Sequence, residues 1–333
     1  MTIWSIRDRG SSGWEVCDVH NHSKGYDVIS DQIIAAAGLP AESLPEASTA
    51  RFPDGAHMRI EIPSVEGPGV LSAVLDEANK RGVVVNRVSQ GSGAMLHTLA
   101  ELREMSMIAA DAGLEISLFV GPREEWGTQA MSRSPEGPAL GGAIRGMRQM
   151  RYAVDDVLRA IDCGIRGFLI ADLGLLNVLK NAQTRGEIPA SVVWKVSVML
   201  APSNAATLAV LAGLGAHTVN LPTDLTVHEL AEMRSVTDLP LDLYVEAPDA
   251  LGGVVRGEQA ADLVRVAAPL YAKFGLRNSR GIYPSGMHLQ ADAELIGREK
   301  VRRAQIAMEW CERSGAQLIQ SAPGAAGLGI PEL

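Results

Sequence analysis

Residues 192–199 read Val-Val-Trp-Lys-Val-Ser-Val-Met. Successive side chains of a strand point to opposite faces, so Trp194 and Val196 share one face of this segment. Lys195 and Ser197 share the other face. A barrel strand that is wrapped by helices needs an apolar outer face, whereas its inner face can carry polar groups. The segment therefore has the pattern of a barrel strand with Lys195 and Ser197 inside.

Seven other short apolar runs resemble this segment, and amphipathic stretches of helical length separate them. The eight predicted strands are Met58–Val65, Val83–Ser89, Leu114–Gly121, Arg166–Asp172, Val192–Met199, His217–Pro222, Leu241–Glu246 and Leu270–Arg277. Eight successive βαβ-type units in a chain of 333 residues predict an α/β fold of the (β/α)8 TIM barrel type over residues 58–333. An open doubly wound sheet is the alternative, although no GxGxxG motif follows the first strand.

Two segments fall outside the repeat. Residues 1–57 form a predicted N-terminal extension with an amphipathic stretch at Asp27–Ala37. This extension could cap the barrel or dock on a second copy in a homo-oligomer. Residues 122–143 form a long loop rich in Gly, Pro and Ser after the third strand. Loops of that length in a compact domain are commonly functional, and we expect this one to act as a lid.

Charge and composition disfavour several classes of protein. The chain has 30 Lys and Arg residues, 39 Asp and Glu residues and a formal net charge of -9, without a basic run, so nucleic acid is not an expected partner. It contains no run of about 18 apolar residues, and its N-terminus lacks the apolar segment of a signal peptide. The three cysteines are far apart, which argues against a disulfide framework. We expect a cytoplasmic protein that acts on a small molecule and has no membrane partner.

The same alternation in the other strands predicts a polar barrel interior. The inward polar residues are Glu61, Ser117, Lys195, Ser197, Asn220, Asp242, Tyr244, Glu246, Lys273 and Arg277. Charged residues deep in a strand commonly form ion pairs with one another. A functional role is favoured at the carboxyl ends of the strands, where the active sites of barrels are built.

The predicted catalytic residues are Glu246, Asp172 and Lys273. Glu246 is the proton-transfer candidate, because burial between a barrel wall and a lid raises the pKa of a carboxyl group. Lys195 or Lys273 could form a Schiff base if burial lowers the pKa of the lysine, and an ion pair is the alternative for both. The predicted substrate-binding residues, of which the arginines suit a carboxylate or phosphate, are Glu61, Gln90, Arg123, Asn220, Arg277, Arg280 and His288.

A histidine pair lies in the N-terminal extension, at His20 and His22. Two histidines at i and i+2 of a strand point to the same side, as metal-dependent hydrolases of the amidohydrolase kind require at their first strand. The pair could hold a divalent metal. The alternative is a solvated turn or a hydrogen-bonded structural pair.

Two stretches carry a family resemblance. Gly167–Leu176 reads Gly-Phe-Leu-Ile-Ala-Asp-Leu-Gly-Leu-Leu, and Leu214–Thr226 reads Leu-Gly-Ala-His-Thr-Val-Asn-Leu-Pro-Thr-Asp-Leu-Thr. Together with Arg59–Pro63, they resemble the collagenase-like family of unassigned peptidases known as U32. The resemblance implies a barrel with a deep polar pocket. Where the family usually carries Arg-Glu-Leu-Ser this chain has Thr-Asp-Leu-Thr at 223–226, and it lacks the family's cysteine cluster, so we expect a divergent member without an iron–sulfur centre.

These features lead to three hypotheses. The first is a barrel enzyme of hydrolase or lyase type that acts on a small polar or anionic substrate, with Glu246 transferring the proton. The second is a metal-dependent hydrolase that uses His20 and His22. The third is a non-catalytic barrel that binds a ligand or serves as a subunit of a complex.

Overall fold

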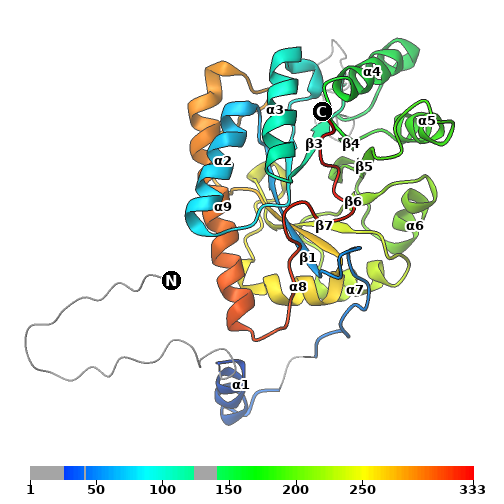
Figure 1. Ribbon diagram of the computed structural model, residues 1–333. Helices are drawn as coiled ribbons and strands as arrows, with labels where there is room; N and C mark the ends of the chain where they lie inside the picture. The colour runs from blue at the N-terminus through cyan, green and yellow to red at the C-terminus, as the bar shows by residue number, and fades with distance from the viewer. Residues whose placement is uncertain (1–25, 41–42, 124–140) are drawn as a thin grey trace, which may run out of the picture.

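The computed structural model describes residues 26–40, 43–123 and 141–333. In this part of the chain, eight parallel strands follow one another around a closed barrel, and helices surround them (Figure 1). The strands are β1 (Met58–Pro63), β2 (Arg87–Gln90), β3 (Glu115–Phe119), β4 (Gly167–Ile170), β5 (Val193–Val196), β6 (Thr218–Asn220), β7 (Leu241–Glu246) and β8 (Leu270–Phe274). The predicted (β/α)8 barrel is confirmed.

Helices connect each strand to the next and cover the outside of the barrel. They are α2 (Pro68–Arg81), α3 (Leu99–Asp111), α4 (Gly146–Ile161), α5 (Leu173–Thr184), α6 (Ala205–Gly213), α7 (Val227–Arg234), α8 (Ala260–Ala267) and, after β8, α9 (Gln290–Arg313). Local sequence starts several of them. Thr98 and Thr226 form capping boxes with the glutamates three residues later, and Asn204 caps α6 through the Thr207 amide. These side chains satisfy amides that have no partner inside the helix.

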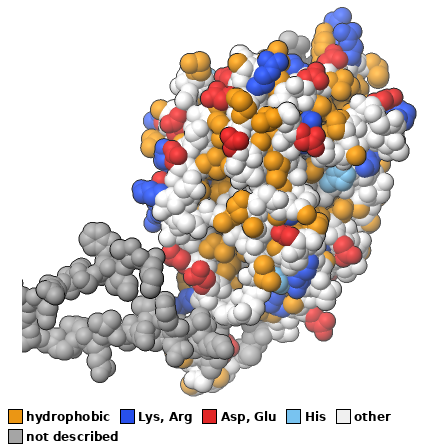
Figure 2. Space-filling model, viewed as in Figure 1, with side chains coloured by type: hydrophobic (Ala, Val, Ile, Leu, Met, Phe, Trp, Pro, Cys, Tyr) orange, Lys and Arg blue, Asp and Glu red, His pale blue; other side chains and the backbone are white. Residues whose placement is uncertain are grey.

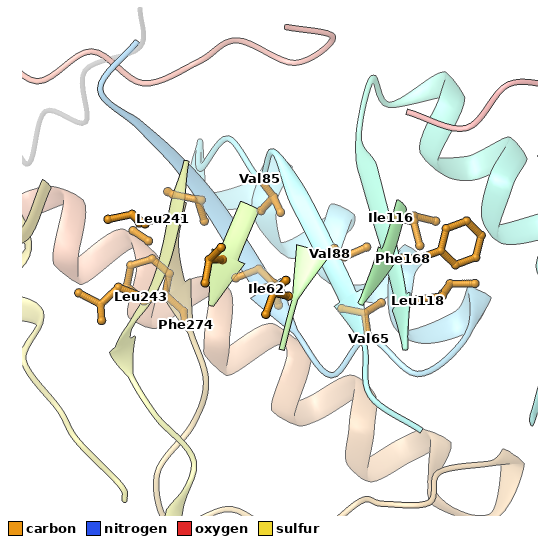
Figure 3. Packing of buried hydrophobic residues seen from close by; sticks show 14 of the residues in the cluster. Ile62, Val65, Val85, Val88, Ile116, Leu118, Phe168, Leu241, Leu243 and Phe274 are labelled. Atoms are coloured by element: carbon orange, nitrogen blue, oxygen red, sulfur yellow. The ribbon is translucent and has the colours of Figure 1, made fainter. Parts of the chain in front are cut away.

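The outer faces of the strands supply the hydrophobic core. Ile62, Ile116, Leu118, Phe168 and Leu243 are all fully buried between strands and helices (Figure 3). Each such side chain contributes roughly 1.5–3 kcal/mol by leaving water. The core therefore lies in the ring between sheet and helices, and the barrel interior is left to other side chains.

Most strands are shorter than predicted, and two of the changed boundaries have clear local reasons. β2 begins at Arg87 and not at Val83, because the Asn86 side chain accepts a hydrogen bond from the Ile60 amide and replaces the strand ladder there. β8 ends at Phe274, and Asn278 turns the chain with a φ of 54°. Arg277, predicted to lie inside the barrel on strand eight, is therefore a loop residue.

The C-terminal segment after α9 closes the amino end of the barrel. It crosses this end in Figure 1, and the space-filling view shows a continuous surface there (Figure 2). Arg59 of β1 donates hydrogen bonds to the Ser321 hydroxyl at 2.9 Å and the Ala326 carbonyl at 2.6 Å. The Gly329 amide donates to Glu115 of β3 at 3.1 Å. Interior charges at this end thus have partners from the tail.

The N-terminal extension is described from residue 26 onward, apart from residues 41 and 42. Its helix α1 (Tyr26–Ala36) occupies the predicted amphipathic stretch, and Ile29, Ile33 and Ile34 on it are exposed. Closer to the barrel, Phe52 lies under the Arg59 guanidinium, 4.1 Å from ring centroid to carbon. Docking of the extension on a second copy stays a prediction. Within the described ranges, no helix is both long enough and apolar enough to cross a bilayer.

Candidate functional site

Interior side chains from alternate strands form layers along the barrel axis, as is usual for this fold. The register of the strands places one central layer on the odd-numbered strands, namely Glu61, Ser117, Lys195 and Asp242. The layer above it, toward the carboxyl ends, comes from the even-numbered strands and contains Ser89, Leu169, Asn220 and Lys273. The next layer contains Phe119, Ser197 and Tyr244. The structure thus places seven of the predicted interior residues inside the barrel. They are Glu61, Ser117, Lys195, Asn220, Asp242, Tyr244 and Lys273.

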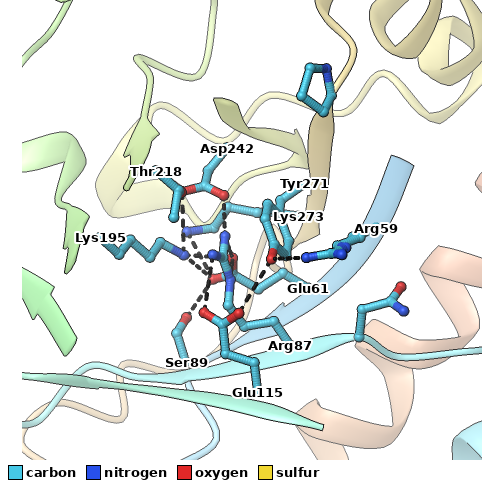
Figure 4. Close-up of polar contacts among 12 residues, drawn as sticks. Arg59, Glu61, Arg87, Ser89, Glu115, Lys195, Thr218, Asp242, Tyr271 and Lys273 are labelled. Carbon is cyan, nitrogen blue, oxygen red and sulfur yellow. Dashed lines mark hydrogen bonds and ion pairs between the residues drawn. The ribbon is translucent and has the colours of Figure 1, made fainter. Parts of the chain in front are cut away.

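Glu61 is the hub of a buried polar cluster in the central layer (Figure 4). The Lys195 Nζ atom lies 2.5 Å from each of the Glu61 carboxylate oxygens, and the Lys273 Nζ atom lies 3.2 Å from one of them. Arg87 Nε donates to the same carboxylate at 2.7 Å, and the Ser89 hydroxyl donates at 2.6 Å. Four side chains therefore converge on one carboxylate that is fully buried.

Arg87 extends this cluster toward the amino end. Its guanidinium donates to Asp242 and lies 3.3 Å from a Glu115 oxygen, and it stacks on the Tyr271 ring at 3.4 Å. Thr218 also donates to Asp242. Three carboxylates thus face three basic groups, and this balance is what allows charges to stay buried.

The two interior lysines differ in protonation. Burial lowers the pKa of Lys195 to about 7, and the neighbouring Arg87 charge acts in the same direction. Burial also disfavours the charged form of Lys273, but Glu61 and Tyr244 outweigh it and raise the pKa of Lys273. Burial alone would raise the pKa of Glu61, yet the charges of Arg87, Lys195 and Lys273 hold it well below its ordinary value. Lys195 is therefore the lysine that exchanges between amine and ammonium near neutral pH.

Polar atoms without partners lie at and above the level of Lys195. Ser117 Oγ and Asn220 Oδ1 are buried and have no hydrogen-bond partner within the described residues. Their residues come from β3 and β6, on opposite sides of the barrel. Nearly all buried polar groups in proteins are paired, so such atoms call for a ligand or water between them.

The upper interior has one apolar wall. Phe119, Leu169, Ala171 and Met199, from β3 to the end of β5, form a hydrophobic cluster separate from the main core. Leu169 keeps 9% of its surface accessible although it points into the barrel, so there is space beside it. The Arg123 guanidinium stacks over Phe119 at 3.6 Å, which places this predicted substrate-binding residue at the rim.

The backbone at the carboxyl rim holds unfavourable conformations. Among the described non-glycine residues, positive φ angles occur at Ser64 (61°), Ala201 (45°) and Asn278 (54°). All three lie in loops that follow the carboxyl ends of strands. Strained backbone of this kind is concentrated at functional sites. Tyr283 donates to Ser64 at 2.5 Å, and its ring lies so close to Gly91 that a Cβ there would clash.

Glu246 does not face the interior as predicted. The pairing of β7 with β8 shifts between Tyr244 and Glu246, which places Glu246 opposite the outward-facing Phe274. An extra residue in one strand reverses the side-chain alternation beyond it. Glu246 instead accepts a hydrogen bond from the Arg277 amide at 3.1 Å and lies 3.6 Å from Arg303 of α9. The interior position assigned to Glu246 is therefore wrong.

Asp172 and Gln90 serve local structure. Asp172 caps α5 by accepting from the Leu175 amide at 2.9 Å, and its other oxygen accepts from the Ile144 amide at 3.0 Å. Gln90 exchanges two hydrogen bonds with the backbone of Gly93. Both carboxylate oxygens of Asp172 are thus engaged outside the barrel interior.

Three predicted substrate-binding residues lie on the surface. The Arg277 side chain is 60% exposed and lies 4.0 Å from Asp249. The Arg280 side chain is 80% exposed and pairs with Asp292 at 2.9 Å. His288 is exposed in the short helix η9 (Met287–Leu289). The structure thus brings together Glu61, Asn220 and Lys273, but leaves these three residues apart from them.

The predicted set omitted several interior residues, among them Arg87 and Ser89 of β2, which both donate to Glu61. Val88, the next residue, belongs to the outer core, so strict alternation puts Arg87 and Ser89 inside. The signal was present in the second predicted strand.

His20 and His22 lie outside the described residues, as do residues 124–140 of the predicted lid. Across the described ranges, no group of three or more His, Cys, Asp or Glu side chains could hold a metal ion. Cys163 follows α4 and Cys311 lies on α9, and these helices lie on opposite sides of the barrel (Figure 1). An iron–sulfur cluster needs several cysteines at one place, so these two do not fit one.

Hollows also border the rim outside the barrel interior. One of about 340 Å³ lies between α4 and the loops after β2 and β3, and Asp156 and Arg159 line it. Burial raises the pKa of Asp156 to about 6. Another of about 280 Å³ lies among the loops after β5, β6 and β7. Rim residues form both hollows, and neither is lined by the central layer.

Residues 144–247, from just before α4 to just after β7, match the family model of peptidase family U32. Over these residues the chain is similar to this family. The resemblance carried by Gly167–Leu176 and Leu214–Thr226 is thereby confirmed. In sequence, none of the curated proteins matches this chain.

Solved structures of several other proteins are similar to the chain at low sequence identity. A U32 peptidase is 16% identical over 63% of this chain and 74% of its own, with a TM-score of 0.36. An oxaloacetate acetylhydrolase in complex with the product oxalate is 13% identical over 65% and 75%, with a TM-score of 0.40. A thiamine phosphate pyrophosphorylase from Pyrococcus furiosus is 11% identical over 77% and 98%, with a TM-score of 0.41. At these values none of them assigns a reaction to this chain.

Proposed function

We propose that this chain is an enzyme of hydrolase or lyase type that acts on a small polar or anionic molecule bound in the carboxyl half of the barrel interior. One observation carries the proposal. Ser117 and Asn220 present buried, unpartnered oxygens at and above the layer that contains Lys195, a lysine whose pKa lies near 7. A proton-transfer group works best when its pKa lies near the working pH.

Lys195 takes the proton-transfer role in this proposal, in place of Glu246. Its amine form accepts a proton from a substrate held above it by Asn220 and Ser117. Glu61, 2.5 Å from Nζ, stabilises the ammonium that results. Lys273 remains an ammonium throughout, because Glu61 raises its pKa, and it stabilises negative charge that develops on the substrate.

Imine formation by Lys195 is the second candidate. Its lowered pKa favours this reaction as well, because an uncharged amine can attack a carbonyl carbon and release water. The raised pKa of Lys273 makes that lysine the weaker nucleophile.

The test compares Lys195→Met with Lys80→Met, a lysine that is 74% exposed on α2. Small esters, amides, hydroxy acids and oxo acids are incubated with each protein and followed by proton NMR. We expect turnover by the wild type and Lys80→Met to rise through pH 7, and Lys195→Met to lose at least 100-fold. A mass increase after borohydride reduction with an oxo acid, absent in Lys195→Met, identifies the imine route. Unchanged turnover in Lys195→Met contradicts the proposal and leaves the barrel a structural charge cluster or a non-catalytic binding module.

A further inference from the structure

We propose that the substrate is a small amphiphilic hydroxy acid, with its hydroxyl group on Asn220, its carboxylate on Lys273 and an aliphatic or aromatic part against the apolar wall. This inference rests on the proposed function and names the class of molecule that the same site takes. It follows from which groups in the upper interior lack partners and from how polar and apolar side chains are divided there.

The unpartnered atoms require a hydrogen-bond donor. Asn220 Oδ1 accepts hydrogen bonds, and the described residues offer it no donor. Asn220 is 2% exposed, so bulk water cannot serve it freely. A hydroxyl group on the ligand donates to this oxygen and also accepts from Ser117, whose hydroxyl is unpartnered across the barrel. A simple carboxylate has no donor to offer.

The apolar wall requires a nonpolar part. Phe119, Leu169 and Ala171 line the β3–β4 side, where Leu169 borders accessible space. Lys273 and Tyr244 occupy the opposite side, on β8 and β7. A polyhydroxylated ligand would leave the apolar wall without contacts, and a hydrocarbon would leave Asn220 unpaired. A molecule with one face of each kind satisfies both walls.

Lys273 supplies the anion-binding group. It lies in the same layer as Asn220, keeps its charge, and contacts Glu61 at 3.2 Å and the Tyr244 side chain. An ammonium carries three donors, so one stays available for a ligand carboxylate beside Glu61 and Tyr244. The interior of an eight-stranded barrel has room for at most one small ligand beside its side chains, which limits the ligand to a small acid.

Calorimetric titration of the full-length protein tests this class of ligand. The probes are lactate, 2-hydroxyisocaproate and 3-phenyllactate, each compared with its counterpart lacking the hydroxyl group: propionate, 4-methylpentanoate and 3-phenylpropionate. We expect affinity to rise roughly fourfold for each additional buried methylene. Loss of the hydroxyl group should weaken binding by about tenfold, because Asn220 is then left unpaired.

Two variants test which wall binds which part of the ligand. An exposed asparagine on α5, Asn177, is the control. In Asn220→Leu the hydroxy acids and their counterparts should bind alike, whereas Asn177→Leu should keep the tenfold preference. Leu169→Asn should reduce the increase in affinity from lactate to 3-phenyllactate. The preference for acids that carry the hydroxyl group should remain. Circular dichroism confirms that each variant is folded.

Three outcomes would overturn the inference: equal affinity for lactate and 3-phenyllactate, a hydroxyl preference that persists in Asn220→Leu, or no binding of any of the acids. Binding needs no turnover, so these results leave the role of Lys195 to its own test. Conversely, the acids could bind as expected while the Lys195→Met variant keeps full turnover. That pair of results would refute the proton-transfer role of Lys195 but support the proposed class of ligand.

Discussion

The two ends of the barrel interior differ in whether their buried polar groups have hydrogen-bond partners. At the amino end, Arg59 and Glu115 are bound by residues of the C-terminal tail. Toward the carboxyl end, Ser117 and Asn220 carry oxygens that the described residues leave without partners. At the first end, buried hydrogen bonds hold the fold together. At the second end, buried oxygens keep hydrogen-bonding capacity that a ligand could use. The contrast matches the division in barrels between a stabilising face and a catalytic face.

The largest expected effect comes from breaking the hub between the two ends. Glu61→Leu leaves Lys195, Lys273 and Arg87 without their common partner. Loss of one partner in a buried charge cluster commonly destabilises by about 3–5 kcal/mol. Urea unfolding should show a loss of this order. Glu187→Leu, at an exposed pair with Arg185, is the control and should leave the midpoint unchanged.

A smaller loss is expected at the amino end. Arg59→Met removes hydrogen bonds to Ser321, Ala326 and Tyr271, and should lower the free energy of unfolding by about 2 kcal/mol. Affinity for 2-hydroxyisocaproate should stay within about twofold, because Arg59 acts only on the closed end. A tenfold loss of affinity in a folded Arg59→Met protein would contradict the claim that the amino end only stabilises the fold.

The pH dependence of stability separates Lys195 from the rest of the cluster. Its pKa is about 7 in the folded protein, against 10.5 as its ordinary value. Between these values the unfolded chain binds the proton and the folded protein does not, so the contribution of Lys195 to stability rises with pH. Lys195→Met should remove this rise when urea unfolding is compared at pH 6, 7, 8 and 9. An identical pH dependence in both proteins would mean that Lys195 stays charged.

The smallest effect is expected at the surface loop after β8. Arg280 is 80% exposed and pairs with Asp292, so Arg280→Ala should change affinity for 2-hydroxyisocaproate by less than about twofold. Titration calorimetry measures this directly. A tenfold loss would restore Arg280 as the substrate-binding residue that its position in the sequence suggested, and would extend the site onto the loop.

Strand alternation explains how much of this interior could be predicted. It placed Glu61, Lys195 and Asp242 inside the barrel because each lies in a regular strand flanked by outward apolar residues. It failed at Glu246, because a register shift near the end of β7 reverses the alternation. It also failed at Arg277, because β8 stops at Phe274. Side-chain direction is predictable in this way within regular strands. The positions of bulges and strand ends depend instead on contacts with neighbouring segments.

Other features of the site depend on tertiary contacts. The sequence alone does not show that Asn220 lacks a hydrogen-bond partner, because partners come from strands far along the chain. The different pKa shifts of Lys195 and Lys273 arise from their distances to Glu61 and Arg87. The capping role of Asp172, in contrast, had a local signal, since an aspartate directly before a helical stretch favours an N-cap.

The most direct test of the contrast between the ends is a paired measurement on Asn220→Leu: the free energy of unfolding in urea and the affinity for 2-hydroxyisocaproate. If Asn220 Oδ1 is kept for a ligand, replacing it removes a buried unpartnered acceptor, so the ligand-free variant should be as stable as the wild type or more stable. Affinity should fall by about tenfold. A variant destabilised by about 2 kcal/mol or more that binds the acid as the wild type does would contradict the account.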